Sequence, residues 1–305
     1  MKGSRRQITT QLQGGEQSSS ASERLPAGLY LVSTPIGNLG DITLRALAVL
    51  RQASRIACED TRVTQKLLSA LGIAAAGRLV AYHEHNAAAA TPPLVAAIAA
   101  GESVALASDA GTPLISDPGR ALVAACREAG LPVTALPGAS ALLPALQLAG
   151  LPVTPFLFAG FLPATASERR RAIGALAAVP ATLAFYEAPH RLAASLADLA
   201  ELLGPRPAAV ARELTKRFEE LSCGSLAELA RRYAEAGQPK GEIVLLVGPP
   251  EAGAEVAVDI DAGLRRALAT QSLRDAVAQV AAESGRPRRD VYARALALTR
   301  GDGDA

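Results

Sequence analysis

Short apolar runs alternate with longer amphipathic segments through the first half of the chain. The runs cover residues 29–33, 55–58, 79–82, 104–107 and 133–136. Runs of this length, separated by segments of helical periodicity, are typical of parallel strands joined by helices. The pattern predicts an α/β domain with a largely parallel sheet over residues 27–149.

A second set of alternating segments begins after Pro155. Strands are expected near residues 156–161, 182–186, 208–212 and 242–247, with helices near 167–178, 190–203 and 225–236. This alternation predicts a second α/β domain over residues 150–250, in which strands can run in mixed directions.

Beyond Pro249 and Pro250 the pattern changes to helices alone, which predicts a tail resembling a helix-turn-helix over residues 260–300. Its signals are caps at Ser272 and Asp275, a turn at Gly285 and Pro287, and an apolar face at Val291, Ala295 and Leu298. Two interpretations stay open. A plain helical hairpin is more common than a nucleic-acid reader with such a short motif.

Two further segments complete the organisation. Residues 1–26 are polar and rich in Gln, Ser and Gly, without the apolar core of a signal peptide, and are predicted to form a disordered arm. Residues 129–167 contain no charged side chain, but repeated prolines and glycines would break a membrane helix. We therefore expect them to form core that crosses the domain boundary, with no membrane partner.

The composition restricts the partners. Net charge is only +2 and aromatic residues make up 3% of the chain, so any nucleic-acid surface must come from local basic clusters. Such clusters occur at residues 169–171, 231–232 and 286–289. The three cysteines, Cys58, Cys126 and Cys223, show no metal or redox spacing, which favours a reduced cytoplasmic setting and no bound metal.

Three loops follow predicted strands and precede predicted helices, at residues 33–41, 108–119 and 137–141. Their Gly, Pro, Asn and Asp residues supply turns and allow a ligand to approach the backbone. Since parallel strands end at one sheet edge, the three loops predict a small-molecule crevice. The first loop has Pro35 where a dinucleotide-binding turn needs glycine, and no Gly-Lys-Ser/Thr follows, so neither a Rossmann nor a P-loop site is expected.

The second loop carries two carboxylates. Asp109, at a strand end, is placed to hold a ribose hydroxyl or a cationic ligand. For Asp117 the sequence leaves two interpretations open: a ligand contact, or a cap on the next helix with Pro118 at its first position.

Seven ordered motifs between Gly28 and Gly248 resemble the tetrapyrrole-methylase superfamily of S-adenosylmethionine-dependent methyltransferases. They are Ser-Thr-Pro-Ile-Gly-Asn-Leu-Gly-Asp at 33–41, Cys-Glu-Asp-Thr-Arg at 58–62, Tyr-His-Glu-His-Asn at 82–86, the loop at 108–119, Pro-Gly-Ala-Ser at 137–140, Phe-Tyr-Glu-Ala-Pro-His-Arg at 185–191 and Lys-Gly-Glu at 240–242. The tetrapyrrole-modifying branch has a glycine-rich first loop and Gly-Asp-Pro in the second. Ser-Thr-Pro and Ser-Asp-Ala replace them here, so the resemblance is to the bacterial branch that methylates a cytidine ribose 2′-hydroxyl in small-subunit ribosomal RNA.

The resemblance implies a homodimer of two-domain α/β chains, which binds S-adenosylmethionine in the cleft between the domains. Carried over position by position, it implies cofactor contacts at Ile36, Gly37, Ser108, Asp109, Ala110, Gly111, Ile115, Ser140, Ala141, Glu187, Thr215, Gly241 and Glu242. The implied macromolecular partner is small-subunit ribosomal RNA.

Methyl transfer to a ribose needs an aligned donor and a base or oriented hydrogen bonds at the hydroxyl. Candidate bases follow predicted strands: Glu59, Asp60 and His85, the last close to His83. The candidate substrate contacts are Arg62, Asn86, His190 and Arg191. The competing interpretation of Asp60 and Arg62 is a helix cap with a surface ion pair, and Arg191 could stabilise structure instead of phosphate.

Two rival functions remain at this level. One is a methyltransferase acting on a tetrapyrrole precursor, and the other is a nucleotide-binding module without turnover. If RNA is the substrate, the tail arginines Arg286, Arg288, Arg289 and Arg294 would extend the phosphate-contact surface.

Overall fold

The computed structural model describes residues 25–250, 260–269, 271–284 and 286–301. The predicted N-terminal arm lies outside the described residues, apart from its last two positions. The chain forms two compact units that divide between Ser140 and Ala141, nine residues before the boundary expected from the sequence. Each unit is treated by itself below.

The first unit contains a five-stranded sheet of order β3-β2-β4-β1-β5, in which every described pairing is parallel. Its elements are β1 (Gly28–Val32), a short 3-10 helix (Leu39–Asp41), α1 (Leu44–Gln52), β2 (Arg55–Cys58), α2 (Thr61–Ala70), β3 (Leu79–Ala81), α3 (Ala87–Ala99), β4 (Ser103–Ala107), α4 (Arg120–Glu128) and β5 (Val133–Leu136). The five strands expected from the apolar runs are thereby confirmed.

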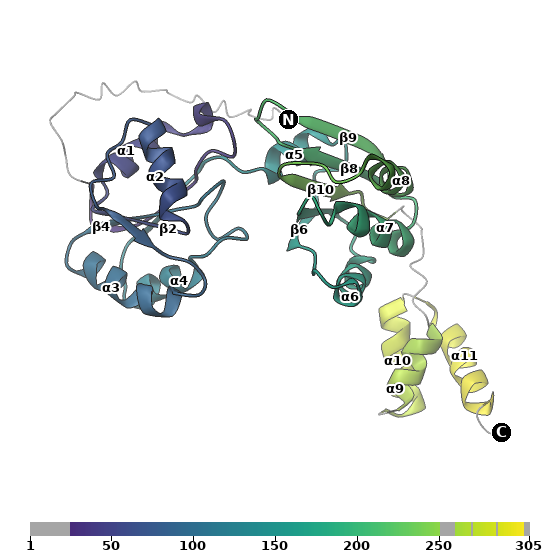
Figure 1. Ribbon diagram of the computed structural model, residues 1–305. Helices are drawn as coiled ribbons and strands as arrows, with labels where there is room; N and C mark the ends of the chain where they lie inside the picture. The colour runs from purple at the N-terminus through teal and green to yellow at the C-terminus, as the bar shows by residue number, and fades with distance from the viewer. Residues whose placement is uncertain (1–24, 251–259, 270, 285, 302–305) are drawn as a thin grey trace, which may run out of the picture. The chain divides into compact units, whose positions relative to one another are not determined.

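Helices cover both faces of this sheet (Figure 1). On one face, Leu50 of α1 and Leu68 of α2 pack with Ile56 of β2. On the other, Leu94 of α3 and Leu122 of α4 pack with apolar side chains of the same strands. Neighbouring strands β1 and β4 therefore lead into helices on opposite faces. In open parallel sheets, such a switch point leaves a ligand-binding crevice beyond the carboxyl ends of the strands.

The second unit is built on a mixed sheet of order β6-β7-β10-β8-β9. Its elements are α5 (Leu142–Leu148), β6 (Phe156–Phe161), α6 (Ala166–Leu176), β7 (Thr182–Glu187), α7 (Leu192–Leu203), β8 (Pro207–Arg212), β9 (Glu220–Ser225), α8 (Leu226–Ala236) and β10 (Ile243–Val247). Only β6 and β7 pair in parallel, because β10 runs antiparallel to β7 and β8, and β8 antiparallel to β9. Mixed strand direction is thus confirmed.

Helices α6, α7 and α8 pack on one face of this sheet, around fully buried side chains such as Phe185, Leu199 and Leu245. Each buried Leu or Phe side chain contributes about 1.5–3 kcal/mol to folding. Helix α8 begins with a capping box, since the Ser225 side chain accepts a hydrogen bond from the Glu228 amide and the Glu228 side chain returns to Ser225. Helix α5 contacts β10.

The C-terminal residues form three helices: α9 (Ile260–Leu268), α10 (Leu273–Ser284) and α11 (Arg288–Gly301). They share a core of their own, in which Leu264, Val280 and Val291 are almost completely buried. The predicted cap is confirmed, because the Ser272 hydroxyl accepts from the Asp275 amide at 3.3 Å. Across the described part of the chain, none of the helices has the length and apolar character required to cross a membrane.

Candidate functional site

The loops after β1 and β4 are joined at the switch point of the first sheet. The amides of Thr34 and Gly111 each donate to the other residue's carbonyl, at 2.9 and 3.0 Å. The buried Thr34 hydroxyl also donates to the Ser108 carbonyl at 2.9 Å. Gly111 has a φ of +79°, and a Cβ there would lie 3.4 Å from the Ile36 side chain. Three predicted cofactor positions, Ile36, Ser108 and Gly111, thus lie around one small piece of backbone.

The loop after β5 joins the same arrangement. The Thr112 hydroxyl donates to the Ala139 carbonyl at 3.0 Å, and Ser33 donates to Thr112 at 3.4 Å. A Cβ at Gly138 would lie 2.6 Å from the Ser33 Cβ. Only glycine therefore allows the third loop to approach the first, and it carries Ser140 to the same sheet edge.

The loop at residues 108–119 is held in an unusual backbone conformation. Leu114 and Ser116 have φ values of +71° and +67°, in the left-handed region that side-chain-bearing residues rarely adopt. Such strain costs about 1–3 kcal/mol per residue and is concentrated at functional sites. Ile115, between these two residues, is 42% exposed and is therefore accessible to a ligand.

Asp117 does not cap the following helix. Helix α4 begins after Gly119 without a side-chain cap, and the Asp117 carboxylate instead accepts a hydrogen bond from the Ser108 hydroxyl. The capping interpretation is therefore wrong. Burial raises the pKa of Asp117, and the nearby Asp109 raises it further.

Three carboxylates influence one another at this edge. The pKa of Glu59 is raised by burial and by the charges of Asp109 and Asp117. The pKa of Asp109 is also raised, mainly by burial, although its carboxylate accepts from the Asp60 amide at 3.2 Å. A cationic ligand would relieve this repulsion, because it favours the ionised form of each group.

Asp60 and Arg62 form the helix cap and surface ion pair that the sequence left as an alternative. The Asp60 carboxylate accepts from the Arg62 amide at 2.8 Å and pairs with its guanidinium at 2.7 Å. These bonds hold the pKa of Asp60 far below its ordinary value. A carboxylate so weakly basic is a poor proton acceptor, so Glu59 is the better candidate base.

The histidine motif forms a tight turn after β3. The Asn86 side chain accepts from the His83 amide at 2.8 Å and donates to the Ala81 carbonyl at 3.0 Å, so it braces the turn. The rings of His83 and His85 lie edge to face, with centroids 6.1 Å apart. His83 Nδ1 is buried without a hydrogen-bond partner among the described residues, while His85 is exposed.

Predicted cofactor residues also gather at one edge of the second sheet. Ile243, the first residue of β10, pairs with Glu187 at the end of β7 and with Arg212 at the end of β8. The register therefore places Glu187 and the segments 213–215 and 241–242 at the same edge. Glu187 and the segment 241–242 are more than fifty positions apart in the sequence, and the antiparallel pairing of β10 with β7 brings them together.

The segments at 213–216 and 240–242 interlock. The Glu213 amide donates to the Glu242 carbonyl at 2.9 Å, and the Glu242 amide donates back to the Glu213 carboxylate at 3.0 Å. Lys216 reaches both carboxylates, at 2.7 and 3.1 Å. Gly241 has a φ of +94°, and a Cβ there would collide with the Glu213 side chain. Sequence analysis missed Glu213 and Lys216, whose partners become apparent only through strand pairing.

Thr215 is the most suggestive residue of this edge. Its φ is +68°, and its hydroxyl is buried without a hydrogen-bond partner among the described residues. An unsatisfied buried hydroxyl is costly, which favours a ligand as its partner.

Two predicted residues of the second unit have structural partners. The Glu187 carboxylate accepts from the Ser195 hydroxyl at 2.5 Å and from the Ala188 amide at 2.8 Å, and it pairs with Arg191 at 3.1 Å. Arg191 also donates to the Leu162 carbonyl. These contacts favour the structural interpretation of the Arg191 side chain and leave exposed His190 as the better substrate candidate.

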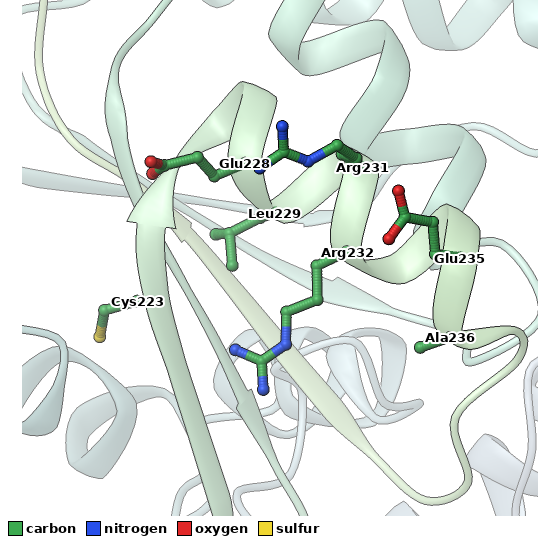
Figure 2. A pocket seen from close by; sticks show the side chains of 7 residues that line it. All are labelled: Cys223, Glu228, Leu229, Arg231, Arg232, Glu235 and Ala236. Atoms are coloured by element: carbon green, nitrogen blue, oxygen red, sulfur yellow. The ribbon is translucent and has the colours of Figure 1, made fainter.

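The basic clusters differ in how much charge they offer to a ligand. Arg169 and Arg170 are bound to Asp198, at 2.7 and 3.0 Å. Arg231 and Arg232 lie along a surface hollow of about 690 Å³ between α8 and β9. Figure 2 shows Glu228 and Glu235 on the same helix, so this hollow has mixed charge. Neither cluster is an uninterrupted phosphate-binding surface.

The fold and the loops at the sheet edge are those of an α/β protein with two units and a candidate ligand site at a switch point. A family model described as Tetrapyrrole (Corrin/Porphyrin) Methylases matches residues 28–230, and one described as RsmI C-terminal HTH domain matches residues 254–299. The chain belongs to the tetrapyrrole methylase family.

Several curated relatives have the same name, "Ribosomal RNA small subunit methyltransferase I". The protein of Mesorhizobium japonicum is 51% identical over 94% of this chain and 98% of its own length. The protein of Escherichia coli O157:H7 is 49% identical over 79% of this chain and 83% of its own length. The similarity therefore covers nearly the whole length of a relative.

Solved structures support the fold. Uroporphyrin-III-C-methyltransferase from Thermus thermophilus is 27% identical, with a TM-score of 0.51 over 73% of this chain and 94% of that one. Diphthine synthase has a TM-score of 0.56 at 16% identity over 72% of this chain and 89% of that one, and it indicates the shared fold only. The same fold thus occurs in proteins with different names, so the fold alone does not select the substrate.

Proposed function

We propose that this chain transfers a methyl group from S-adenosylmethionine to the ribose 2′-hydroxyl of a cytidine in small-subunit ribosomal RNA. The observation that carries the proposal is the Thr34–Gly111 backbone bridge, which joins the loops after β1 and β4 at the switch point of the first sheet. The substrate class follows from the similarity to relatives named for ribosomal RNA of the small subunit. Small ribosomal subunits lie in the cytoplasm, where we expect the protein to act.

The donor is proposed to lie against the loop cluster of the first unit. Its contacts there are Ile36, Gly37, Ser108, Asp109, Ala110, Gly111, Ile115 and Ser140. The exposed Gly37 and Ala110 allow close approach to the backbone, and Asp109 suits a ribose hydroxyl. From the second unit, we propose contacts with Ala141, Glu187, Thr215, Gly241 and Glu242. The buried Thr215 hydroxyl has no hydrogen-bond partner among the described residues and is therefore available to the donor.

Bound S-adenosylmethionine supplies an electrophilic methyl group on a positively charged sulfur. The residues of this chain have two tasks, to align the ribose oxygen and to accept its proton. Glu59 accepts the proton in this proposal, because its raised pKa makes it a stronger base than Asp60. Alignment and base assistance together account for several orders of magnitude in rate.

The decisive experiment uses methyl-labelled S-adenosylmethionine and small ribosomal subunits from cells that lack this protein. We expect label in the ribosomal RNA at a position resistant to alkaline cleavage, since a methylated 2′-oxygen can no longer attack the adjacent phosphate. Labelling of a tetrapyrrole precursor instead would support the first rival function. Tight donor binding with no labelled product in either mixture would support the non-catalytic alternative.

We also propose a homodimer. The second unit leaves several large apolar side chains exposed, including Leu143, Val153, Phe156 and Phe161, which are 41–54% accessible. A second copy of the chain would remove such area from water, which favours association. Sedimentation velocity at micromolar concentration should give a dimer, and Phe161→Glu should shift it toward monomer, whereas Leu44→Glu, at an exposed position of the first unit, should not.

A further inference from the structure

We propose that the three-helix unit α9–α11 contains a groove that binds the phosphate backbone of RNA, formed by Arg274, Arg288 and Arg289 with Tyr292 beside them. The groove is separate from the residues proposed to bind the methyl donor. The inference rests on the proposed function only in taking ribosomal RNA as the ligand.

The groove lies between α10 and α11 and has a volume of about 920 Å³. Its walls carry Arg274 from α10, and Arg288 and Arg289 from α11. Val277 and Ala278 of α10 contribute apolar surface. Val277 belongs to the core that holds these helices together, so the two walls are fixed relative to each other.

Two of the three cations in the groove are free to bind a ligand. Within the described residues, Arg274 and Arg288 have no side-chain hydrogen bond or ion pair. Arg289 contacts only the adjacent Asp290, at 3.1 Å, and its side chain is 88% exposed. The lining carboxylate, Asp275, already accepts from the Ser272 hydroxyl at 2.6 Å as part of the helix cap. Positive charge therefore exceeds negative charge on the walls.

Arg294 does not belong to this surface, contrary to the sequence-based expectation. Its guanidinium binds Asp261 of α9 through two bonds, at 2.6 and 2.5 Å. The pair links α11 to α9 and neutralises the charge. Of the tail arginines, Arg294 thus stabilises the three-helix unit, whereas Arg288 and Arg289 line the groove.

The combination of side chains favours a nucleic acid. Guanidinium groups match phosphate oxygens in a planar, two-bond geometry. Tyr292 is 45% exposed and provides a ring on which an unpaired base can stack. The hollow between α8 and β9 is smaller, about 690 Å³, and carries Glu228 and Glu235 beside its arginines. The charges of that hollow balance, so a polyanion would be attracted more strongly to the α10–α11 groove, where cations are in excess.

The test is binding of the full chain to protein-free small-subunit ribosomal RNA and to intact small subunits, between about 50 and 200 mM KCl. The variant Arg274→Gln/Arg288→Gln removes two charges from the groove. The control, Arg265→Gln/Arg266→Gln, removes two exposed charges from α9, outside the groove. Helical content by circular dichroism and the thermal unfolding transition, each compared with the parent chain, establish that both variants are folded.

We expect the groove variant to bind RNA at least about tenfold more weakly, because each lost contact is a charged hydrogen bond. Its slope of log affinity against log salt should become shallower by about 1.5, the value for two phosphates. The control should change affinity less than about threefold, and Tyr292→Leu should weaken binding about fivefold or more with an unchanged slope.

Equal losses in the groove variant and the control would overturn the groove, since only net charge would then matter. An unchanged affinity and slope would also overturn it. A loss seen with intact subunits but absent with protein-free RNA would assign the groove to a ribosomal protein instead. If the parent chain binds RNA through the groove but never transfers a methyl group, the proposed function fails while this inference stands.

Discussion

Gly138 is the residue at which a single methyl group should test the site most directly. A Cβ at this position would lie 2.6 Å from the Ser33 Cβ, well inside the 3.4 Å at which ordinary carbon contact begins. Ser33 is 4% exposed and hydrogen-bonded toward Thr112, so it has little room to move. In Gly138→Ala, the loop at 137–141 must therefore shift away from the loop after β1 by about 0.8 Å, the difference between these two distances, to restore ordinary contact.

The shift has two measurable consequences. Overpacking of a buried site costs about 1–3 kcal/mol, and each kcal/mol lowers the melting temperature of a domain of this size by about 2–4 °C. Donor affinity should fall as well, because the displaced loop would lose its proposed contacts with the donor, and each lost hydrogen bond costs about 0.5–1.5 kcal/mol. We expect a dissociation constant for S-adenosylmethionine that is raised about 10- to 100-fold.

The matched control is Gly174→Ala. Gly174 lies within α6, and a Cβ there would meet nothing within 4 Å. Alanine in a helix interior is about 0.5–1 kcal/mol more favourable than glycine, so this substitution should raise the melting temperature. Differential scanning calorimetry and titration calorimetry on both variants provide the comparison. Parental stability and donor affinity in Gly138→Ala would refute the argument that the three loops form one close-packed site.

Three further predictions concern charge and hydrogen bonding. Glu59→Gln should lower the rate of methyl transfer at saturating substrates by about 10²–10⁴-fold. The rate of Asp60→Asn, which preserves a good helix cap, should stay within about threefold of the parent's. Equal losses of rate in single-turnover assays would contradict the assignment of Glu59 as the base. S-adenosylmethionine should bind more weakly as the pH falls from neutral. The reason is that the pKa values of Glu59, Asp109 and Asp117 are raised, so these carboxyls lose their charge at higher pH than ordinary carboxyls. The product S-adenosylhomocysteine, which lacks the sulfonium charge, should show a smaller change in parallel calorimetry, and identical pH profiles would exclude attraction by these carboxylates. Thr215→Val keeps the side-chain shape but removes the unsatisfied hydroxyl, so it should weaken donor binding about tenfold without lowering thermal stability. A variant that is destabilised but binds the donor with parental affinity would assign the hydroxyl a structural role.

Local chemistry made the strands and most helices of this chain predictable. Each strand of the first sheet is a short apolar run that ends at turn residues, and each was found within one residue of the predicted bounds. Strand β9, with the sequence Glu-Leu-Ser-Cys-Gly-Ser, was missed. It has little apolar patterning, and its conformation depends on antiparallel pairing with β8 at the edge of the sheet. Edge strands of this kind are specified by their partner more than by their own residues.

The sequence by itself determined the family, the loop motifs at the strand ends and the residue types available for chemistry, because these depend on order and spacing along the chain. Only the tertiary structure decided between competing roles for the same side chains. It assigned Asp60 to a helix cap, Asp117 to a hydrogen bond with Ser108, and Arg294 to an ion pair with Asp261. The physical reason is that a charged or polar group takes its role from the partners that the folded backbone places within hydrogen-bond distance. Those partners range from Arg62, two residues from Asp60, to Asp261, which lies on a different helix from Arg294.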